Sequence, residues 1–168
     1  MNTETEKHDL AITRTFDAPA AEVWKIWSDP GYVKRWWGPD IFTCPLARID
    51  FREGGTSLVC MNAPRFGDMY STWRYTKIEP MKLIEFIHNL ADSDGNALDP
   101  VALGMPSDFP RDQRQTVTLT PVGDDRTEMT VMEYGWTEGR MMDMARMGME
   151  QCMNKMAAIL AGPPPGTD

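Results

Sequence analysis

The chain has 168 residues, 42% of them hydrophobic, which is enough for one globular domain with a sizeable core. Its formal net charge of −8 argues against a nucleic-acid partner and against binding to an anionic membrane. No stretch approaches the run of about 20 apolar residues that a membrane-spanning helix needs. These properties indicate a globular protein with neither kind of partner.

Three cysteines, at positions 44, 60 and 152, are odd in number and widely spaced. They form no metal-ligand pattern and no disulfide framework, and the chain has only two histidines. The first ten residues, MNTETEKHDL, are polar and carry no secretory signal. We therefore expect no metal site, no cofactor and a reducing, cytoplasmic environment.

The first half of the domain combines one strand with two short helices. Residues 10–16 alternate between apolar and polar side chains and predict a strand, and residues 20–28 place Val23, Trp24 and Trp27 at helical spacing. A second short helix follows with Val33, Trp36 and Trp37, and Gly38-Pro39 ends it. The tryptophans are explained by core packing, with the alternative that Trp37 faces the mouth of a pocket.

From residue 46 onward the apolar period changes to two. It predicts strands over residues 46–51, 56–62, 69–78, 82–90, 113–120 and 127–134. In the fourth of these, Ile84, Phe86 and His88 share one face, which we assign inward because this leaves Glu85 in water. In the last, Met129, Val131 and Glu133 share a face in the same way.

Residues 91–112 form the longest irregular stretch, which is long for a connecting loop. It contains Val101, Leu103, Met105 and Phe109, which a fully solvated loop does not need. Two interpretations remain open: a lid over one end of the sheet, or a loop that is simply packed down.

The last long segment, residues 137–161, predicts an amphipathic helix with Thr137 as its N-cap. One arc of this helix is apolar and contains Met141, Met142, Ala145, Met149, Cys152, Met153, Met156, Ile159 and Leu160. A long one-sided helix needs a broad surface to lie on. The chain thus predicts an α+β domain over residues 9–161, in which a curved antiparallel sheet of about six or seven strands surrounds the C-terminal helix. Residues 1–8 and 162–168 are expected to be flexible tails.

Methionine dominates this apolar arc, and its unbranched, polarizable side chain either fills irregular core space or adapts to varied ligands. Both interpretations are open: an ordinary core, or a deformable cavity lined by the N-terminal half of the arc. Met144 and Met147 lie off the arc and are expected to be exposed. Gly148 in mid-helix costs about 1 kcal/mol against alanine, which favours a close approach of another segment.

Residues 14–39, RTFDAPAAEVWKIWSDPGYVKRWWGP, resemble the opening of the activator of heat-shock protein 90 ATPase-like family. The similarity continues through DFREGG (50–55), IEPMKLIEF (78–86), TVTLTPVGDDRTEMTV (116–131) and the C-terminal helix. This family belongs to the START-like (SRPBCC, helix-grip) superfamily, so the resemblance implies a helix-grip fold with an apolar cavity between sheet and long helix.

Members of that superfamily bind lipids, hormones or polyketides, and some catalyse cyclisation or hydrolysis. Two departures stand out in this chain: residues 91–112 are long, and Glu133 stands where many relatives have a histidine. The resemblance does not make the chain a chaperone activator, because that activity in eukaryotes depends on an additional domain.

The function expected first is binding of a small hydrophobic or amphipathic molecule in the cavity, by a monomer or homodimer. The alternatives are a cyclase- or hydrolase-like enzyme with His88 or Glu133 as acid or base, and a chaperone-related interaction module. His88 and Glu133 could instead be solvated at strand ends. The predicted ligand-binding residues are Trp37, Trp73, Phe86, His88, Met129, Glu133, Met141, Met142, Ala145 and Met149; no catalytic residue is assigned.

Overall fold

The computed structural model describes residues 6–162. Its elements follow one another in the order β1 (Lys7–Phe16), α1 (Ala20–Ser28), α2 (Pro30–Trp36), β2 (Thr43–Arg48), β3 (Thr56–Ala63), β4 (Gly67–Glu79), β5 (Leu83–Ala91), the 3-10 helix η1 (Pro100–Leu103), β6 (Gln113–Pro121), β7 (Thr127–Thr137) and α3 (Arg140–Leu160). The α+β class predicted from the sequence is confirmed.

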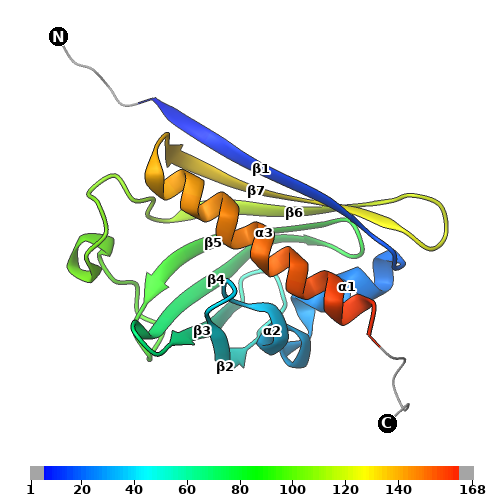
Figure 1. The fold of residues 1–168 in the computed structure, drawn as a ribbon, viewed down its shortest axis with the longest axis horizontal. Helices are drawn as coiled ribbons and strands as arrows, with labels where there is room; N and C mark the ends of the chain where they lie inside the picture. The colour runs from blue at the N-terminus through cyan, green and yellow to red at the C-terminus, as the bar shows by residue number, and fades with distance from the viewer. Residues whose placement is uncertain (1–5, 163–168) are drawn as a thin grey trace.

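The seven strands form one antiparallel sheet in the order β1-β7-β6-β5-β4-β3-β2. The sheet is curved and unclosed, and α3 lies diagonally across its concave face (Figure 1). Helices α1 and α2 lie on the same side, near the C-terminal half of α3 (Figure 1). This is the helix-grip arrangement that the sequence predicted.

The two short helices begin and end where the local sequence dictates. Pro30 occupies the first turn of α2, and the Asp29 carboxylate accepts a hydrogen bond from the Gly31 backbone N–H at 2.8 Å. Asp29 thus ends α1 and starts α2. The large apolar side chains of α1, which are Val23, Trp24, Ile26 and Trp27, are all buried, so the apolar face of this amphipathic helix contacts the core.

Three predicted boundaries are wrong. Strand β1 begins at Lys7, because Lys7 and His8 pair with the end of β7. Thr137 is the last residue of β7 and not a helix cap; α3 begins three residues later, after Gly139. Strand β2 is Thr43–Arg48 and not residues 46–51, because a register shift near Pro45 carries the strand past that proline.

The predicted flexible tails are residues 1–8 and 162–168. Residues 1–5 and 163–168 lie outside the part of the chain that the structure describes. Lys7 and His8 belong to β1, as stated above. No helix in residues 6–162 combines the length and the apolar character that crossing a membrane requires.

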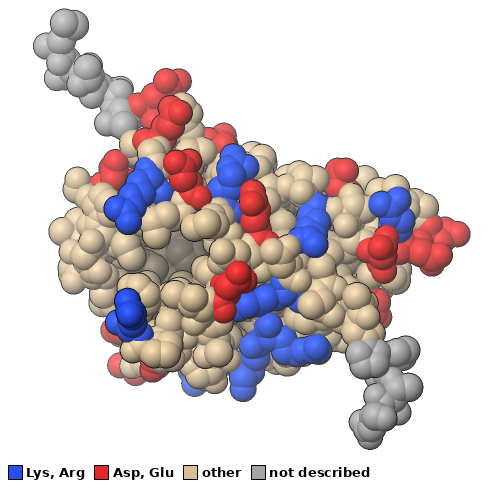
Figure 2. Space-filling model, in the orientation of Figure 1, with Lys and Arg blue, Asp and Glu red and all other residues tan. Residues whose placement is uncertain are grey.

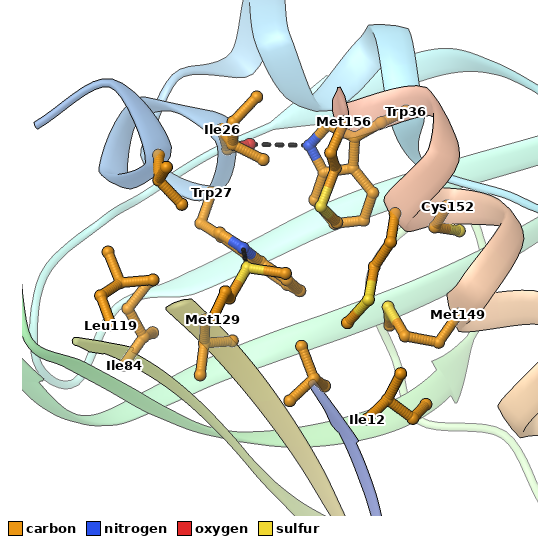
Figure 3. Packing of buried hydrophobic residues seen from close by; sticks show 14 of the residues in the cluster. Ile12, Ile26, Trp27, Trp36, Ile84, Leu119, Met129, Met149, Cys152 and Met156 are labelled. Carbon is orange, nitrogen blue, oxygen red and sulfur yellow. Dashed lines mark hydrogen bonds between the residues drawn. The ribbon is translucent and has the colours of Figure 1, made fainter. Parts of the chain in front are cut away.

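The core fills the space between the sheet and the C-terminal half of α3 (Figure 3). Trp27 of α1 donates its indole N–H to the Met129 sulfur at 3.3 Å, and Trp36 of α2 donates to the Ile26 carbonyl at 2.7 Å (Figure 3). Met156 is fully buried beside them. Both indole donors are therefore satisfied inside an otherwise apolar core.

Candidate ligand-binding cavity

A cavity of about 220 Å³ lies between the N-terminal half of α3 and the inner face of the sheet. Figure 2 shows a hollow in the surface on this side of the molecule, with mostly uncharged residues around it. Its lining comprises Trp37, Gly38, Pro39, Met61, Met69, Ser71, His88, Leu90, Met105, Phe109, Gln113, Gln115, Glu133, Trp136, Met141, Met144, Ala145, Gly148, Met149 and Cys152. Most of these side chains are apolar.

The wall formed by α3 is held at a fixed distance from the segment after α2. A Cβ atom on Gly148 would lie 3.3 Å from Cγ of Pro39, so the glycine permits the close approach that its position in mid-helix predicted. Two turns further along, the Lys155 ammonium donates to the backbone carbonyls of Gly38, Pro39 and Phe42 at 2.8, 3.1 and 3.0 Å. Lys155 thus fastens one edge of the cavity to the helix.

Polar side chains cross the floor of the cavity from strand to strand. His88 of β5 lies opposite Gln113 of β6, and Gln115 of β6 lies opposite Glu133 of β7. The Gln115 amide donates to the Gln113 amide oxygen at 2.9 Å, and Gln113 donates to the Tyr134 carbonyl at 3.1 Å. The floor is therefore a polar row under an apolar helix.

Glu133 is buried, with 6% of its surface exposed, so the alternative of a solvated strand end does not hold for it. One carboxylate oxygen accepts a hydrogen bond from the Trp136 indole N–H at 3.2 Å. Burial in this apolar space raises the pKa of Glu133 to about 7, and the Trp136 hydrogen bond opposes that rise. The carboxyl group therefore titrates near neutral pH.

His88 borders the same cavity and keeps part of its surface accessible there. Its neighbours on the inner face of β5 are the fully buried Ile84 and Phe86, which confirms the predicted inward face. Burial lowers the pKa of His88 to about 4. The imidazole is thus neutral at physiological pH and can both donate and accept one hydrogen bond.

The third wall comes from the segment between β5 and β6. Met105 and Phe109 line the cavity, and the Phe109 ring packs edge-on against Trp136 with centroids 5.5 Å apart. An ion pair of 2.7 Å joins Arg111 to Asp99 within the segment. The segment covers the cavity; its opening and closing as a lid stays a prediction.

An adjoining hollow of about 470 Å³ lies on the other side of this wall. Met69, Leu90 and Met105 border both spaces. A ligand that outgrows the first cavity would therefore meet these three side chains.

Six of the ten predicted ligand-binding residues line the cavity: Trp37, His88, Glu133, Met141, Ala145 and Met149. The other four do not border it. Trp73, Phe86 and Met129 are fully buried in the packed core, and Met142 packs against that core from α3. Trp37, predicted in one alternative to face a pocket mouth, is half-buried and edge-on to Trp73 with centroids 5.1 Å apart.

Several lining residues went unrecognised in the sequence. Gln113 and Gln115 share the inward face of β6 with Val117 and Leu119, so the strand alternation could have identified them. Met144 was expected to be exposed; 46% of its surface is, and it also contributes to the rim of the cavity. Met61, Met69 and Trp136 depend on how distant strands pair, which no local pattern reveals.

The sequence model of the family described as "Activator of Hsp90 ATPase homolog 1-like protein" matches residues 17–161. The chain belongs to this family. No curated protein matches it.

Among solved structures, a protein from Arthrobacter aurescens is 29% identical, with 95% of this chain and 90% of that chain covered and a TM-score of 0.75. A protein from Mycobacterium smegmatis is 23% identical over 92% and 91% of the two chains, with a TM-score of 0.73. An AHSA1 protein from Silicibacter pomeroyi is 18% identical over 92% and 98%, also with a TM-score of 0.73. The last two likenesses concern the fold alone.

Proposed function

We propose that the chain binds a small, mainly apolar molecule in the cavity beneath residues 141–149. One observation carries the proposal: an apolar helix wall and a polar floor enclose about 220 Å³ that no side chain fills. Ligand sites in proteins have this composition, with an apolar lining and a few convergent polar groups. The family and the fold support the same conclusion, since they suggest a START-like ligand-binding domain.

The dimensions limit the ligand. A volume of about 220 Å³ is smaller than the roughly 300–1,000 Å³ typical of drug-sized ligands. The flexible methionines of α3 and Met105 can adjust to different shapes. The ligand class is therefore a compact molecule, or the polar end of a longer one that continues past Met105.

Cavity filling tests the proposal. Ala145 of α3 borders the cavity, and Ala158 of the same helix is exposed. We expect Ala145→Phe to abolish binding of a small neutral probe such as hexan-2-one, followed by chemical-shift changes in NMR, while Ala158→Phe binds it like the wild type. Thermal unfolding of both variants establishes that they fold. Shift changes that are the same in the two variants would place the probe elsewhere and overturn the proposal.

A second candidate function is catalysis on such a molecule, favoured by the presence of Glu133 and His88 in one cavity with pKa values of about 7 and 4. A buried acid that titrates near neutral pH can act as a general acid or base. The test is hydrolysis of a small uncharged ester. Activity that is lost in Glu133→Gln but kept in Glu128→Gln would favour catalysis over binding alone.

Three further expectations remain proposals. The free cysteines at positions 44, 60 and 152 are buried, which supports a reducing cytoplasmic location. A monomer or homodimer is consistent with a domain that encloses its cavity within one chain. A chaperone-related interaction would use the exposed Met144 and Met147.

A further inference from the structure

The charge of the cavity wall limits which polar group a ligand can carry. Among the lining residues, all within the described part of the chain, none is lysine or arginine. The wall does contain one carboxyl group, on Glu133. An anionic head group would therefore meet a like charge and no cation.

Two basic residues that adjoin the cavity lining are engaged in other contacts. The Lys155 ammonium already donates to three backbone carbonyls. Arg114, between Gln113 and Gln115 on β6, points to the opposite face of the sheet, where it pairs with Glu85 at 2.7 Å and lies over the Tyr134 ring. Neither can turn toward a ligand without breaking these contacts.

Uncharged hydrogen-bonding groups, by contrast, are free in the cavity. Within residues 6–162 the only fully buried side-chain nitrogen or oxygen without a partner is the Trp37 indole nitrogen. The second carboxyl oxygen of Glu133 and the imidazole nitrogens of His88 have no hydrogen-bond partner within these residues and are not fully buried, so we infer that they face the open space. The hydroxyl of Ser71, which also lines the cavity, is free in the same way.

We propose that this cavity selects an uncharged ligand with a carbonyl, hydroxyl or amide group directed at Glu133 and His88, and that it rejects carboxylates. The inference rests on the proposed function and adds the chemical class of the ligand. The physical reason is desolvation: an anion in this apolar space gains no opposite charge to compensate for the water it loses.

Glu133 also makes the selection dependent on pH. The groups next to it are Leu10 of β1, Gln115 of β6, Trp136 of β7 and Cys152 of α3, and His88 of β5 lines the same cavity. The pKa of His88 is about 4 and that of Cys152 about 12, so both are neutral between pH 5.5 and 8.5. Over this interval Glu133, with a pKa of about 7, is the group that changes charge.

Two probes with the same six-carbon length test the selection: hexan-2-one and hexanoate. Each is titrated into the full chain at pH 7.0 and followed by NMR shifts of cavity residues. We expect hexan-2-one to bind at least tenfold more tightly than hexanoate. Equal or tighter binding of hexanoate overturns the inference but leaves the proposed function standing. Failure of both to bind overturns the proposed function itself.

The pH dependence supplies a second, independent readout. Protonated Glu133 can donate to the ketone oxygen, whereas its carboxylate cannot, so hexan-2-one should bind about fivefold more weakly at pH 8.5 than at pH 5.5. The Glu133→Gln variant keeps an amide donor and should bind the ketone equally at both pH values. Glu128 lies on the same strand with its side chain exposed, so Glu128→Gln should retain the wild-type dependence. A pH dependence that persists in Glu133→Gln overturns the role assigned to this carboxyl group.

Discussion

The two halves of α3 face the same sheet, yet one half packs solidly and the other covers a cavity. Toward its C-terminal end, Met153 and Met156 are almost completely buried (Figure 3 shows Met156). Toward its N-terminal end, Met141 and Ala145 line open space of about 220 Å³. Both halves are rich in methionine, so the difference does not come from the composition of the helix.

The difference comes from what lies opposite each half. Trp27 and Trp36, brought in by α1 and α2, fill the space under the C-terminal half, with ring centroids 4.6 Å apart. The N-terminal half has no such helix opposite it and faces the polar row that includes His88 and Glu133. These two tryptophans therefore determine which part of the space between the sheet and α3 is filled and which part stays open.

The largest expected effect on stability comes from replacing Trp36, and its neighbour Trp37 serves as the comparison. Trp36 is fully buried and its N–H is bonded to the Ile26 carbonyl, whereas Trp37 is half-buried and borders the cavity. Trp36→Ala should lower the free energy of unfolding by about 4 kcal/mol, since it removes a large packed ring and leaves a buried carbonyl unpaired. Trp37→Ala should cost less than half as much. Urea denaturation measures both, and equal losses would mean that the two ends are packed alike.

The fold was largely predictable because apolar residues recur at the spacing of a strand or of a helix over most elements. Alternation over β5 and β7 correctly turned Ile84, Phe86, Met129 and Val131 inward, and the long apolar arc identified α3. Element boundaries were predicted wrongly where pairing with a distant strand overrides the local sequence pattern. Pro45 lies inside β2 at a register shift, and Thr137 ends β7 because pairing with β1 extends that strand.

The site was predictable only in part, for a different reason. Alternation tells which face of a strand points inward, but not how far along the sheet the packed core extends. Trp73, Phe86 and Met129 were assigned to the cavity although Trp27 packs against each of them. The sequence does not contain the position of α1 relative to α3, so it could not separate filled from open space.

The two ends should also differ in their response to pH, because Glu133 and His88, whose pKa values burial moves to about 7 and about 4, both line the cavity at the open end. The pKa of Glu133 is raised from 4.5 to about 7, so the folded state holds its proton longer and stability falls as pH rises through this interval. The pKa of His88 is lowered from 6.5 to about 4, so stability falls as pH decreases through that interval. The two contributions oppose each other and nearly cancel between pH 4.5 and 6.5.

Removing either group should therefore expose the pH dependence of stability that the two contributions conceal in the wild type. Relative to the wild-type profile, the free energy of unfolding of Glu133→Gln should rise by up to about 3 kcal/mol from pH 4.5 to 7, because the Glu133 contribution that falls over this interval is gone. The free energy of unfolding of His88→Gln should fall by a similar amount from pH 4 to 6.5, relative to the same profile. Chemical denaturation at several pH values measures both, and Glu128→Gln controls for the loss of a carboxylate from β7. If all three profiles run parallel to the wild type, neither group is held in its neutral form.

The smallest expected effect concerns two exposed methionines of the open end. Met144 and Met147 expose 46% and 54% of their surfaces, so replacing either with alanine should change stability by less than about 0.5 kcal/mol. Only Met144 borders the cavity, and Met144→Ala should weaken hexan-2-one binding a few-fold while Met147→Ala leaves it unchanged. Isothermal or NMR titration separates the two variants. Equal weakening by both would indicate that the probe lies on the outer surface of α3, where a protein partner would bind, because a molecule enclosed between helix and sheet cannot contact Met147.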